Sequence, residues 1–335
     1  MANRPIYSRK QLGEYFDRIR FPQSQRLYDA QTLDGTGQHN YLCRLLKHQI
    51  VTVPWENLSQ HYSWHRVVDI NPSHLFRKIV SHGRNRGGYC MEANTFFLTV
   101  LLSLNFQVYA AGARVFEGDH FGSFTHCVSI VNISGIKYMI DVGFGAKGPT
   151  LPISLADPGK AQDQVAPASM QVVCKSTVQN LDQSQKVWIY QHRISPEAEW
   201  MPIYSFVELE FLPEDLQVLN CGPWRSPNSF FTHKVIVCRF TTSSEKPPAA
   251  GADGGGPGSA DEKALTDGEI NGQLTIEHGT MKWRQRGTKV LERKFQNDAE
   301  RVSALKQFFG IELAADDIAA IGNSAAEVTA KGFAL

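Results

Sequence analysis

The sequence has neither a long apolar segment nor an excess of charge of one sign. Its longest apolar stretch, at 96–106, is interrupted by polar residues and is far shorter than the roughly 20 residues of a membrane-spanning helix. The first residues, MANRPIYSRKQLGEYF, lack the apolar core of a secretory signal. Lys and Arg total 34 and Asp and Glu total 33, so no basic surplus favours nucleic acid or an anionic membrane. We therefore expect a cytoplasmic protein with no nucleic-acid or membrane partner.

Cysteine pairs of the CxxC type are also missing, which excludes a zinc ribbon and a thioredoxin-like motif. His61 and His65 form a lone pair without a third ligand, so we expect no metal site. In a reducing compartment the cysteines should be free thiols, mostly buried as small hydrophobic residues. There are six: Cys43, Cys90, Cys127, Cys174, Cys221 and Cys238.

The chain has the composition of a globular protein, with 42% hydrophobic and 20% charged residues. Its 335 residues suggest about two or three domains. The first third has the apolar spacing of helices, at 12–19, 42–50, 75–79 and about 91–104, with Ser8 as an N-cap and Pro54 as a stop. Strand-like segments follow at 106–116, 125–133, 136–144, 186–194 and 204–209.

The last third mixes the two patterns. A strand is predicted at 234–241, a hairpin at 274–285, and a helix around 302–308 that ends at Gly310. The segment at 158–169 is typical of a surface loop, and the low-complexity segment at 242–263 of a flexible one. Helices followed by strands and then a mixed part indicate an α+β fold, with domains at 1–104, 105–212 and 213–335.

A cysteine preceded by two glycines opens the predicted helix at 91–104. The segment at 86–94 reads RGGYCMEAN. Glycines permit a tight turn and a positive φ. The N–H groups and partial positive charge of a helix N-terminus favour the thiolate that attacks, and can also hold an oxyanion. Position alone fits a buried structural cysteine equally well, so Cys90 is at this point a candidate nucleophile.

His126 and Asp141 fall on neighbouring predicted strands. A turn at 132–135 joins these strands into an antiparallel hairpin, whose expected register places His126 directly opposite Asp141. An aspartate beside a histidine orients the imidazole and stabilises its charged form, and a cysteine on the other side completes a nucleophilic triad. A His–Asp pair alone can be purely structural, but the three elements together favour a Cys90–His126–Asp141 triad.

The segment RGGYCMEAN resembles the signature of the arylamine N-acetyltransferases. Two further segments are similar to that family in the same order: VPWENL at 53–58, with Trp55 where the family has phenylalanine, and DVGFG at 141–145. The similarity extends from Leu12 to FFGIEL at 308–313, and the segment at 242–263 departs from it. A later block keeps the family's spacing at Asn220, Pro227, Ser229, Phe231 and Arg239.

This resemblance implies an N-terminal helical bundle carrying the nucleophile on its last helix, a central β-barrel and a C-terminal α/β lid. It implies transfer of an acetyl or other short acyl group from acyl-CoA to the nitrogen of an arylamine, arylhydroxylamine or arylhydrazine. The expected mechanism is ping-pong through an acyl-Cys90 intermediate. Acetyl-CoA is the expected donor, and malonyl-CoA is a second candidate because some fungal members prefer it. No permanently bound cofactor is expected.

The resemblance also implies roles for individual residues. Cys90 is the nucleophile, His126 the base and later the acid, and Asp141 the residue that orients His126, with a thiolate–imidazolium pair at rest. The amide of Cys90 and the backbone near Ser123 and Phe124 would hold the acyl oxyanion.

Binding residues follow from the same motifs. The expected substrate-binding residues are Trp55, Phe144 and Phe231, and the expected CoA-binding residues are Ser123, Phe124, Asn228 and Ser229. Arg86 and Glu92 are expected to form a structural ion pair that supports the turn before Cys90. Three cations, Lys234, Lys282 and Arg284, can reach CoA phosphates, but a solvated charged surface is the commoner explanation, so they receive no role.

Two other hypotheses use the same residues. A hydrolase, such as a cysteine protease or a transglutaminase-like enzyme, shares Cys-His-Asp chemistry. The block at 220–239 disfavours it. A binding or structural protein that keeps only the scaffold is disfavoured by the intact set of Cys90, His126 and Asp141.

Overall fold

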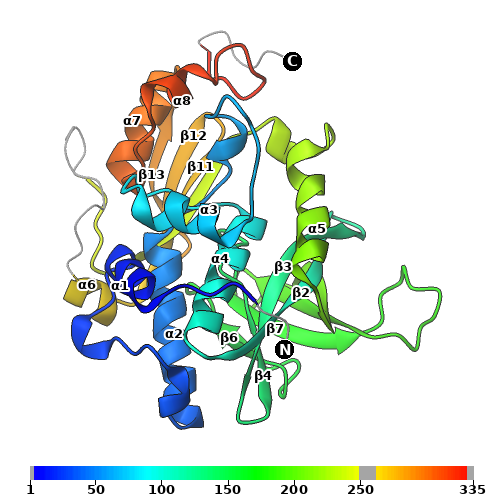
Figure 1. The fold of residues 1–335 in the computed structure, drawn as a ribbon. Coiled ribbons are helices and arrows are strands. Elements are labelled where there is room, and N and C mark those ends of the chain that lie inside the picture. The colour runs from blue at the N-terminus through cyan, green and yellow to red at the C-terminus, as the bar shows by residue number, and fades with distance from the viewer. Residues whose placement is uncertain (1–3, 249–261, 330–335) are drawn as a thin grey trace.

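The computed structural model describes residues 4–248 and 262–329, shown as a ribbon in Figure 1. Within these ranges helices occupy most of the N-terminal third, and two antiparallel sheets make up most of the rest. The predicted α+β class is confirmed. The helices are α1 (Arg9–Arg18), α2 (Gly35–Thr52), α3 (Pro72–Phe76), α4 (Cys90–Ser103), α5 (Pro213–Arg225), α6 (Glu262–Asp267), α7 (Asp298–Phe309) and α8 (Ala315–Ala319).

The N-terminal helices form where their capping and apolar residues predict them. The Ser8 side chain accepts from the N–H of Gln11, and the Gln11 side chain accepts from the N–H of Ser8, which closes a capping box before α1. Leu12, Tyr15 and Phe16 of α1 are buried, as the spacing predicts. Helix α2 ends at Thr52, just before Pro54.

The larger sheet has eight strands in the described residues and curls around its own core. Its edge strands, β5 and β6, have two residues each and are not paired with one another. The predicted β-barrel is therefore an open curved sheet, because such short edges cannot form a closing ladder. In spatial order the strands are β5 (Ile153–Ser154), β4 (Ile136–Ile140), β3 (Phe121–Ile133), β2 (Gln107–Phe116), β9 (Met201–Glu210), β8 (Val187–Arg193), β7 (Ser169–Lys175) and β6 (Gln162–Asp163).

The smaller sheet combines distant parts of the chain. Strand β1 (Trp55–Glu56) pairs with β10 (Ile236–Thr242), with Trp55 opposite Cys238. Trp55 also forms a bridge to Gly88, just before α4. Helix α7 packs on one face of this sheet through Leu305 and its neighbours. The order continues from β10 through β11 (Ile270–Glu277), β12 (Thr280–Gln285) and β13 (Thr288–Lys294).

Several expectations for the loops and the last third need correction. The segment at 158–169 contains strand β6, and nothing in the sequence analysis predicted α5 or β13. At the start of the segment at 242–263, Thr242 ends β10 and Glu245 is buried, with its carboxylate 2.7 Å from the guanidinium of Arg239. That ion pair holds the chain just after the strand. Residues 249–261 of the segment lie outside the described residues.

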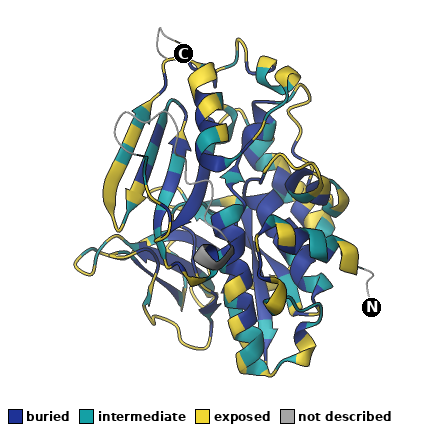
Figure 2. Ribbon diagram, turned by 90° about the vertical axis from the view of Figure 1, so that its left-hand side faces the viewer, coloured by how far each residue is buried: buried dark blue, intermediate teal, exposed yellow. Residues whose placement is uncertain are grey.

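The buried residues collect where the helices meet the two sheets, as Figure 2 shows. Tyr41, Phe96 and Val131 belong to the core that joins the N-terminal helices to the larger sheet. In residues 4–248 and 262–329, no helix is both long and apolar enough to cross a bilayer.

Arg301 of α7 is fully buried and holds the C-terminal part of the chain in place. Its guanidinium lies 2.5 Å from the Asp298 carboxylate and donates to the Tyr62 hydroxyl at 2.8 Å and the Ala326 carbonyl at 2.8 Å. Arg301→Met removes the ion pair of Asp298 and the donor to the Ala326 carbonyl, so that the Asp298 charge keeps only the neutral donors Tyr62 and the Val328 N–H. We expect it to lower the free energy of unfolding by about 3 kcal/mol in urea denaturation.

Lys306→Met is the matched control, because Lys306 lies on the same helix and its side chain is 71% exposed. A loss of stability in Arg301→Met no larger than in Lys306→Met would show that the buried guanidinium does not hold this region together.

Candidate active site

Cys90 is the first residue of α4 and follows a turn packed tightly against the backbone of Pro54. A Cβ atom on Gly87 would lie 1.7 Å from the Pro54 carbonyl oxygen. Neither Gly87 nor Gly88 has a positive φ. A side chain at Gly87 would collide with the Pro54 backbone, so glycine is needed there for lack of space and not for a left-handed conformation. The turn therefore delivers Cys90, which is only 6% exposed, to the N-terminus of a buried helix.

A buried ion network lies beneath this turn. Glu56 accepts from the Arg86 guanidinium at 3.0 Å and from the Leu58 N–H at 2.6 Å. The Lys78 ammonium lies 2.7 Å from Glu92 and 3.4 Å from Glu56. Burial raises the pKa of Glu56, but the charges of Arg86 and Lys78 outweigh it and lower that pKa to about 2.

The expected ion pair between Arg86 and Glu92 is wrong. Arg86 pairs with Glu56, and Glu92 pairs with Lys78. Spacing along the chain suggested the pair, but β1 brings Glu56 next to the turn, because the Glu56 N–H bonds the Gly88 carbonyl at 3.1 Å.

His126 and Asp141 are in direct contact and fully buried. Nε2 of His126 lies 2.8 Å from Oδ2 of Asp141. The expected register is off by two residues: Ser129 faces Ile140, so His126 is diagonal to Asp141 and not opposite it. A shift of two keeps both side chains on the same face of the sheet, which is why the contact still forms.

The Cys90 side chain lies near enough to the His126 imidazole to help raise its pKa, which places Cys90, His126 and Asp141 in one group. Nε2 of His126 is bonded to Asp141, so Nδ1 is the ring nitrogen left free for the thiol. Burial lowers the pKa of His126, but the Asp141 charge and the bonds to Asp141 and Cys90 outweigh it and raise that pKa to about 10. The imidazole is therefore charged at neutral pH.

Asn94 holds the Asp141 carboxylate in place, a residue to which the sequence analysis gave no role. Its Nδ2 donates to Oδ1 of Asp141 at 2.9 Å and to the Cys127 carbonyl at 2.7 Å, and its Oδ1 accepts from the Val142 N–H at 2.9 Å. Asn94 is four residues after Cys90 on α4, so both side chains lie on the same face of the helix. The four-residue spacing between Cys90 and Asn94 was the feature of the sequence that could have identified Asn94.

Strand β3 is irregular next to the thiol. His126 faces Ala113 of β2 while Phe124 faces Arg114, so Thr125 is the extra residue of a β-bulge. The Cys90 sulfur lies 3.8 Å from the Thr125 carbonyl oxygen. Helix α5 lies over this bulge, close enough that a Cβ on Gly222 would be 3.2 Å from the Thr125 methyl group.

Helix α5 is also tied to the residue before the nucleophile. The Tyr89 hydroxyl donates to the Asn220 side chain, and Asn220 Nδ2 donates to the Val68 carbonyl at 2.8 Å. The Tyr89 ring meets the edge of Phe231 at 5.7 Å between centroids. Residues 220–231 therefore form one wall of the site.

Two aromatic groups lie next to the triad residues. Trp55 donates its indole N–H to the Gly143 carbonyl at 2.6 Å and has its ring 5.7 Å from that of Phe231. Phe144 lies edge-on to the His126 imidazole at 5.3 Å and near the Tyr204 ring at 5.1 Å.

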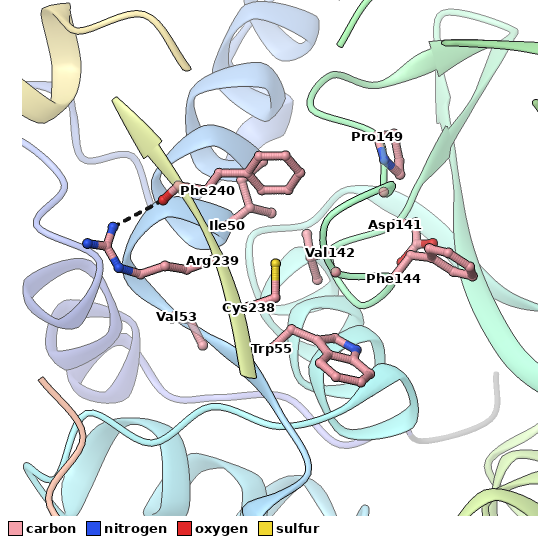
Figure 3. Close-up of a pocket in the computed structure, with 12 residues that line it drawn as sticks. Ile50, Val53, Trp55, Asp141, Val142, Phe144, Pro149, Cys238, Arg239 and Phe240 are labelled. Carbon is pink, nitrogen blue, oxygen red and sulfur yellow. Dashed lines mark hydrogen bonds between the residues drawn. The ribbon is translucent and has the colours of Figure 1, made fainter. Parts of the chain in front are cut away.

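Figure 3 shows a small cavity beside this group, with Trp55 and Phe144 both on its wall. Cys238 and Arg239 of β10 point to opposite sides of their strand there, Cys238 toward the cavity. The cavity measures about 10 Å³, which is at the lower limit for one water molecule. It is therefore too small to be the expected substrate slot, and Phe231 does not line it.

Comparison with known proteins establishes the family to which this chain belongs. A model of the N-acetyltransferase family matches residues 40–246, more than half of this chain. The chain belongs to the arylamine N-acetyltransferase family. It is an acyltransferase, and acyl-CoA is the co-substrate of that family.

Two relatives of this chain match different lengths of it. N-malonyltransferase FDB2 of Fusarium pseudograminearum (strain CS3096) is 29% identical, over 93% of this chain and 91% of that protein. Human arylamine N-acetyltransferase 1 is 28% identical, over 68% of this chain and 77% of that protein.

Solved structures show the same fold. The arylamine N-acetyltransferase from Mycobacterium abscessus aligns with a TM-score of 0.71 at 23% identity, covering 93% of each chain. The Mycobacterium marinum enzyme in complex with CoA aligns with a TM-score of 0.67 at 22% identity, covering 93% of this chain and 95% of that one.

The residues expected to bind CoA occupy two places in this N-acetyltransferase family member. Asn228 is exposed and Ser229 half-buried, just before η5 (Phe230–Thr232), where the Ser229 hydroxyl accepts from the Phe231 N–H at 3.3 Å. Ser123 is exposed, and the Phe124 ring packs against Phe211 at 5.4 Å with the Arg114 guanidinium 3.9 Å from its centre. The backbone contact to Cys90 comes from Thr125, one residue further along β3.

In the described part of this N-acetyltransferase family member, no group of three or more His, Cys, Asp or Glu side chains is arranged so that it could hold a metal ion. His61 is used differently: its Nε2 lies 2.8 Å from the Phe231 carbonyl oxygen and 3.1 Å from that of Lys234. It fastens the segment that carries Phe231.

The bond between Asp141 and His126 makes stability depend on pH. Because the His126 pKa is raised from 6.5 to about 10, the folded chain holds this proton more tightly than the unfolded chain. The stabilisation is complete below pH 6.5 and is lost as pH rises toward 10. Asp141→Asn removes the main group that raises this pKa, so its free energy of unfolding should fall less over that range in urea denaturation.

Asp157→Asn is a suitable control, since it removes an exposed carboxylate that is not part of the triad. Equal pH slopes for wild type and Asp141→Asn would contradict the assignment of the charged imidazole to this pair.

Proposed function

We propose that this chain transfers a short acyl group from acyl-CoA to the nitrogen of an aromatic amine, hydroxylamine or hydrazine through an acyl-Cys90 intermediate. The observation that carries the proposal is the connected group of Cys90, His126 and Asp141 at the N-terminus of α4. Family membership supports the acyl transfer itself. The aromatic acceptor is supported by Trp55, Phe231 and Phe144 around the group.

In the first half-reaction the Cys90 thiolate attacks the thioester carbonyl carbon. A new C–S bond forms to Cys90 and the bond to the CoA sulfur breaks. The imidazolium of His126 gives its proton to the departing CoA thiolate, so free CoA leaves and His126 becomes neutral. A charged His126 before the step is supported by its raised pKa.

In the second half-reaction the amine nitrogen attacks the carbonyl carbon of acyl-Cys90. The neutral His126 accepts a proton from that nitrogen, the C–S bond breaks, and Cys90 leaves as the thiolate. The thiolate–imidazolium pair is thereby restored. The Asp141 carboxylate, held by Asn94 and by the Gly143 N–H at 2.7 Å, keeps the ring oriented through both steps.

The oxyanion of each tetrahedral intermediate needs donors next to the sulfur. As the first residue of α4, Cys90 has an N–H without an intrahelical acceptor, and we assign this N–H to the oxyanion. The Thr125 carbonyl, 3.8 Å from the sulfur, is an acceptor and cannot serve. Backbone N–H groups around the bulge at Thr125 are the candidates for a second donor.

Malonyl-CoA is the donor we favour, with acetyl-CoA second. The N-malonyltransferases match over 91% of their own length and 93% of this chain, whereas human arylamine N-acetyltransferase 1 matches over 68% of this chain. This ranking reverses the order expected from the sequence. Three domains at 1–104, 105–212 and 213–335, CoA contacts at Asn228 and Ser229, and a cytoplasmic location stay predictions.

Intact-protein mass spectrometry tests the intermediate. Incubation with malonyl-CoA or acetyl-CoA, without an amine, should add one acyl group to the wild-type chain, because the second half-reaction has no acceptor. Cys90→Ala should gain none. Cys174→Ala is the control, since Cys174 is an exposed cysteine on β7, and it should be acylated like wild type.

Acylation of Cys90→Ala, or no adduct from either donor, would contradict the covalent route. Hydrolysis of amides without CoA would instead favour the Cys-His-Asp hydrolase. The extent of labelling by the two donors ranks them directly.

A further inference from the structure

The segment between α5 and β10 carries one aromatic residue of the active site on a largely exposed stretch of chain. Phe231 is half-buried, and its ring lies 5.7 Å from the Trp55 ring and 5.7 Å from the Tyr89 ring. Because Tyr89 directly precedes Cys90, the position of this segment decides where the Phe231 ring lies relative to the thiol. Its exposed residues are Pro227, Asn228, Phe230, His233 and Lys234.

Two buried side chains, Asn57 and His61, hold the backbone of this segment and are called the clamp here. They lie directly before and after η3 (Leu58–Gln60). Asn57 Nδ2 donates to the carbonyl oxygen of Phe231 at 3.2 Å and to that of Lys234 at 2.7 Å. His61 Nε2 lies 2.8 Å and 3.1 Å from the same two oxygens. Each carbonyl is therefore bonded from both members of the clamp.

The partners of His61 fix the position of its hydrogen. Carbonyl oxygens only accept hydrogen bonds, so Nε2 carries the hydrogen and donates to both of them. Burial lowers the pKa of His61 to about 4 and outweighs the bond to the Phe231 carbonyl, which raises it. The ring is therefore neutral at neutral pH, and what it supplies to the segment is one N–H group at one position.

The clamp stands on a rigid base. Leu58 and Tyr62 are buried in the core of the smaller sheet, and the Tyr62 N–H donates to the Leu58 carbonyl at 2.7 Å. Asn57 also belongs to that sheet, because its Oδ1 accepts from the Ile236 N–H at 2.8 Å. Replacing Asn57 would therefore disturb the sheet, whereas the His61 ring bonds the exposed segment and is the better residue to test.

An aromatic wall on an exposed segment orients a flat substrate only if the segment keeps one position. A displacement of about 1 Å can lower a rate by up to about a hundredfold. The demand is greatest for the acceptor, whose nitrogen must be aimed at the acyl carbon by contacts to its ring. The donor brings its thioester on a flexible arm, so the first half-reaction depends less on this wall.

We propose that His61 is a positioning residue for the acceptor. By holding the Phe231 carbonyl it fixes the aromatic wall, and it thereby makes the second half-reaction selective for amines and hydrazines that carry an aromatic ring over small ones that do not. The inference rests on the proposed function, because it assumes an aromatic acceptor that attacks an acyl group on Cys90. His61 acts through Phe231 and takes no part in making or breaking bonds.

Two amide variants at position 61 separate the donor group from its reach. His61→Gln places an amide nitrogen close to the position of Nε2, and the shorter side chain of His61→Asn places one close to that of Nδ1, too far from the two carbonyls. His65→Asn is the matched control, because His65 is exposed and lies four residues further along the chain. All three variants leave Asn57 and the triad in place.

Rates with phenylhydrazine, and with unsubstituted hydrazine as an acceptor that has no ring, measure the selectivity. In a ping-pong reaction kcat/KM for the acceptor reports only the second half-reaction. His61→Asn should lose about tenfold in kcat/KM for phenylhydrazine, while its kcat/KM for hydrazine and for acyl-CoA stays at the wild-type value. His61→Gln should recover the wild-type selectivity, and His65→Asn should never lose it.

Equal losses with phenylhydrazine and hydrazine in His61→Asn would overturn the inference, since a merely structural role lowers both. So would unchanged rates in His61→Asn, or a loss in His61→Gln as large as in His61→Asn. Phe231→Leu covers the case in which His61→Asn does not fold. It removes the ring directly and should lose the same selectivity, and a wild-type ratio between the two hydrazines in Phe231→Leu would also overturn the inference.

The two proposals can fail separately. If wild type acylates phenylhydrazine without forming an adduct on Cys90, and His61→Asn loses selectivity, the role of His61 stands and the covalent mechanism fails. If the adduct forms and His61→Asn keeps the wild-type ratio between the two hydrazines, the mechanism stands and the role of His61 fails.

Discussion

The carboxylate of Glu56 is completely buried at the junction of three segments, and its charge is tolerated only because each segment supplies a donor. Arg86 comes from the turn before Cys90, Lys78 from η4 (Arg77–Ser81), and the Leu58 N–H from the chain after β1. A buried carboxylate without such partners costs several kcal/mol. The position of the nucleophile is therefore linked to the position of β1, and through β1 to the smaller sheet.

That link explains why the site has parts from the whole chain. Trp55, next to Glu56, bonds the Gly143 carbonyl and contacts Phe231. Gly143 itself lies so close to α4 that a Cβ there would be 2.9 Å from the Cys90 Cα. The larger sheet, the helix that carries Cys90 and the segment that carries Phe231 thus converge on one strand of two residues. Loss of any one of these contacts would therefore move Cys90 and the groups around it together.

Local sequence patterns predicted much of this arrangement. Ser8, the spacing of Leu12 and Tyr15, and Gly310 with its left-handed conformation each mark a helix end or face that the structure contains. The contact of His126 with Asp141 followed from a hairpin, because a two-residue error in register leaves the side chains on the same face. Such features depend on neighbours in the chain or on a single turn.

Features set by distant contacts were missed. The partner of Arg86 is thirty residues away and reaches it only through β1. Helix α5 contains Gly222 and Pro223, which weaken a helical pattern, although Pro213, Glu214 and Asp215 mark its first turn.

Strand β1 also limits how the chain can be divided. It belongs by sequence to the helical part and by hydrogen bonding to the C-terminal sheet. A fragment ending before the smaller sheet would leave Trp55 without its ladder, and a fragment beginning after the helices would leave β10 with an open edge. Unpaired edges of this kind recruit other strands. The chain should therefore fold and evolve as one unit, with insertions accepted at its surface loops but not at the boundary between helices and sheets.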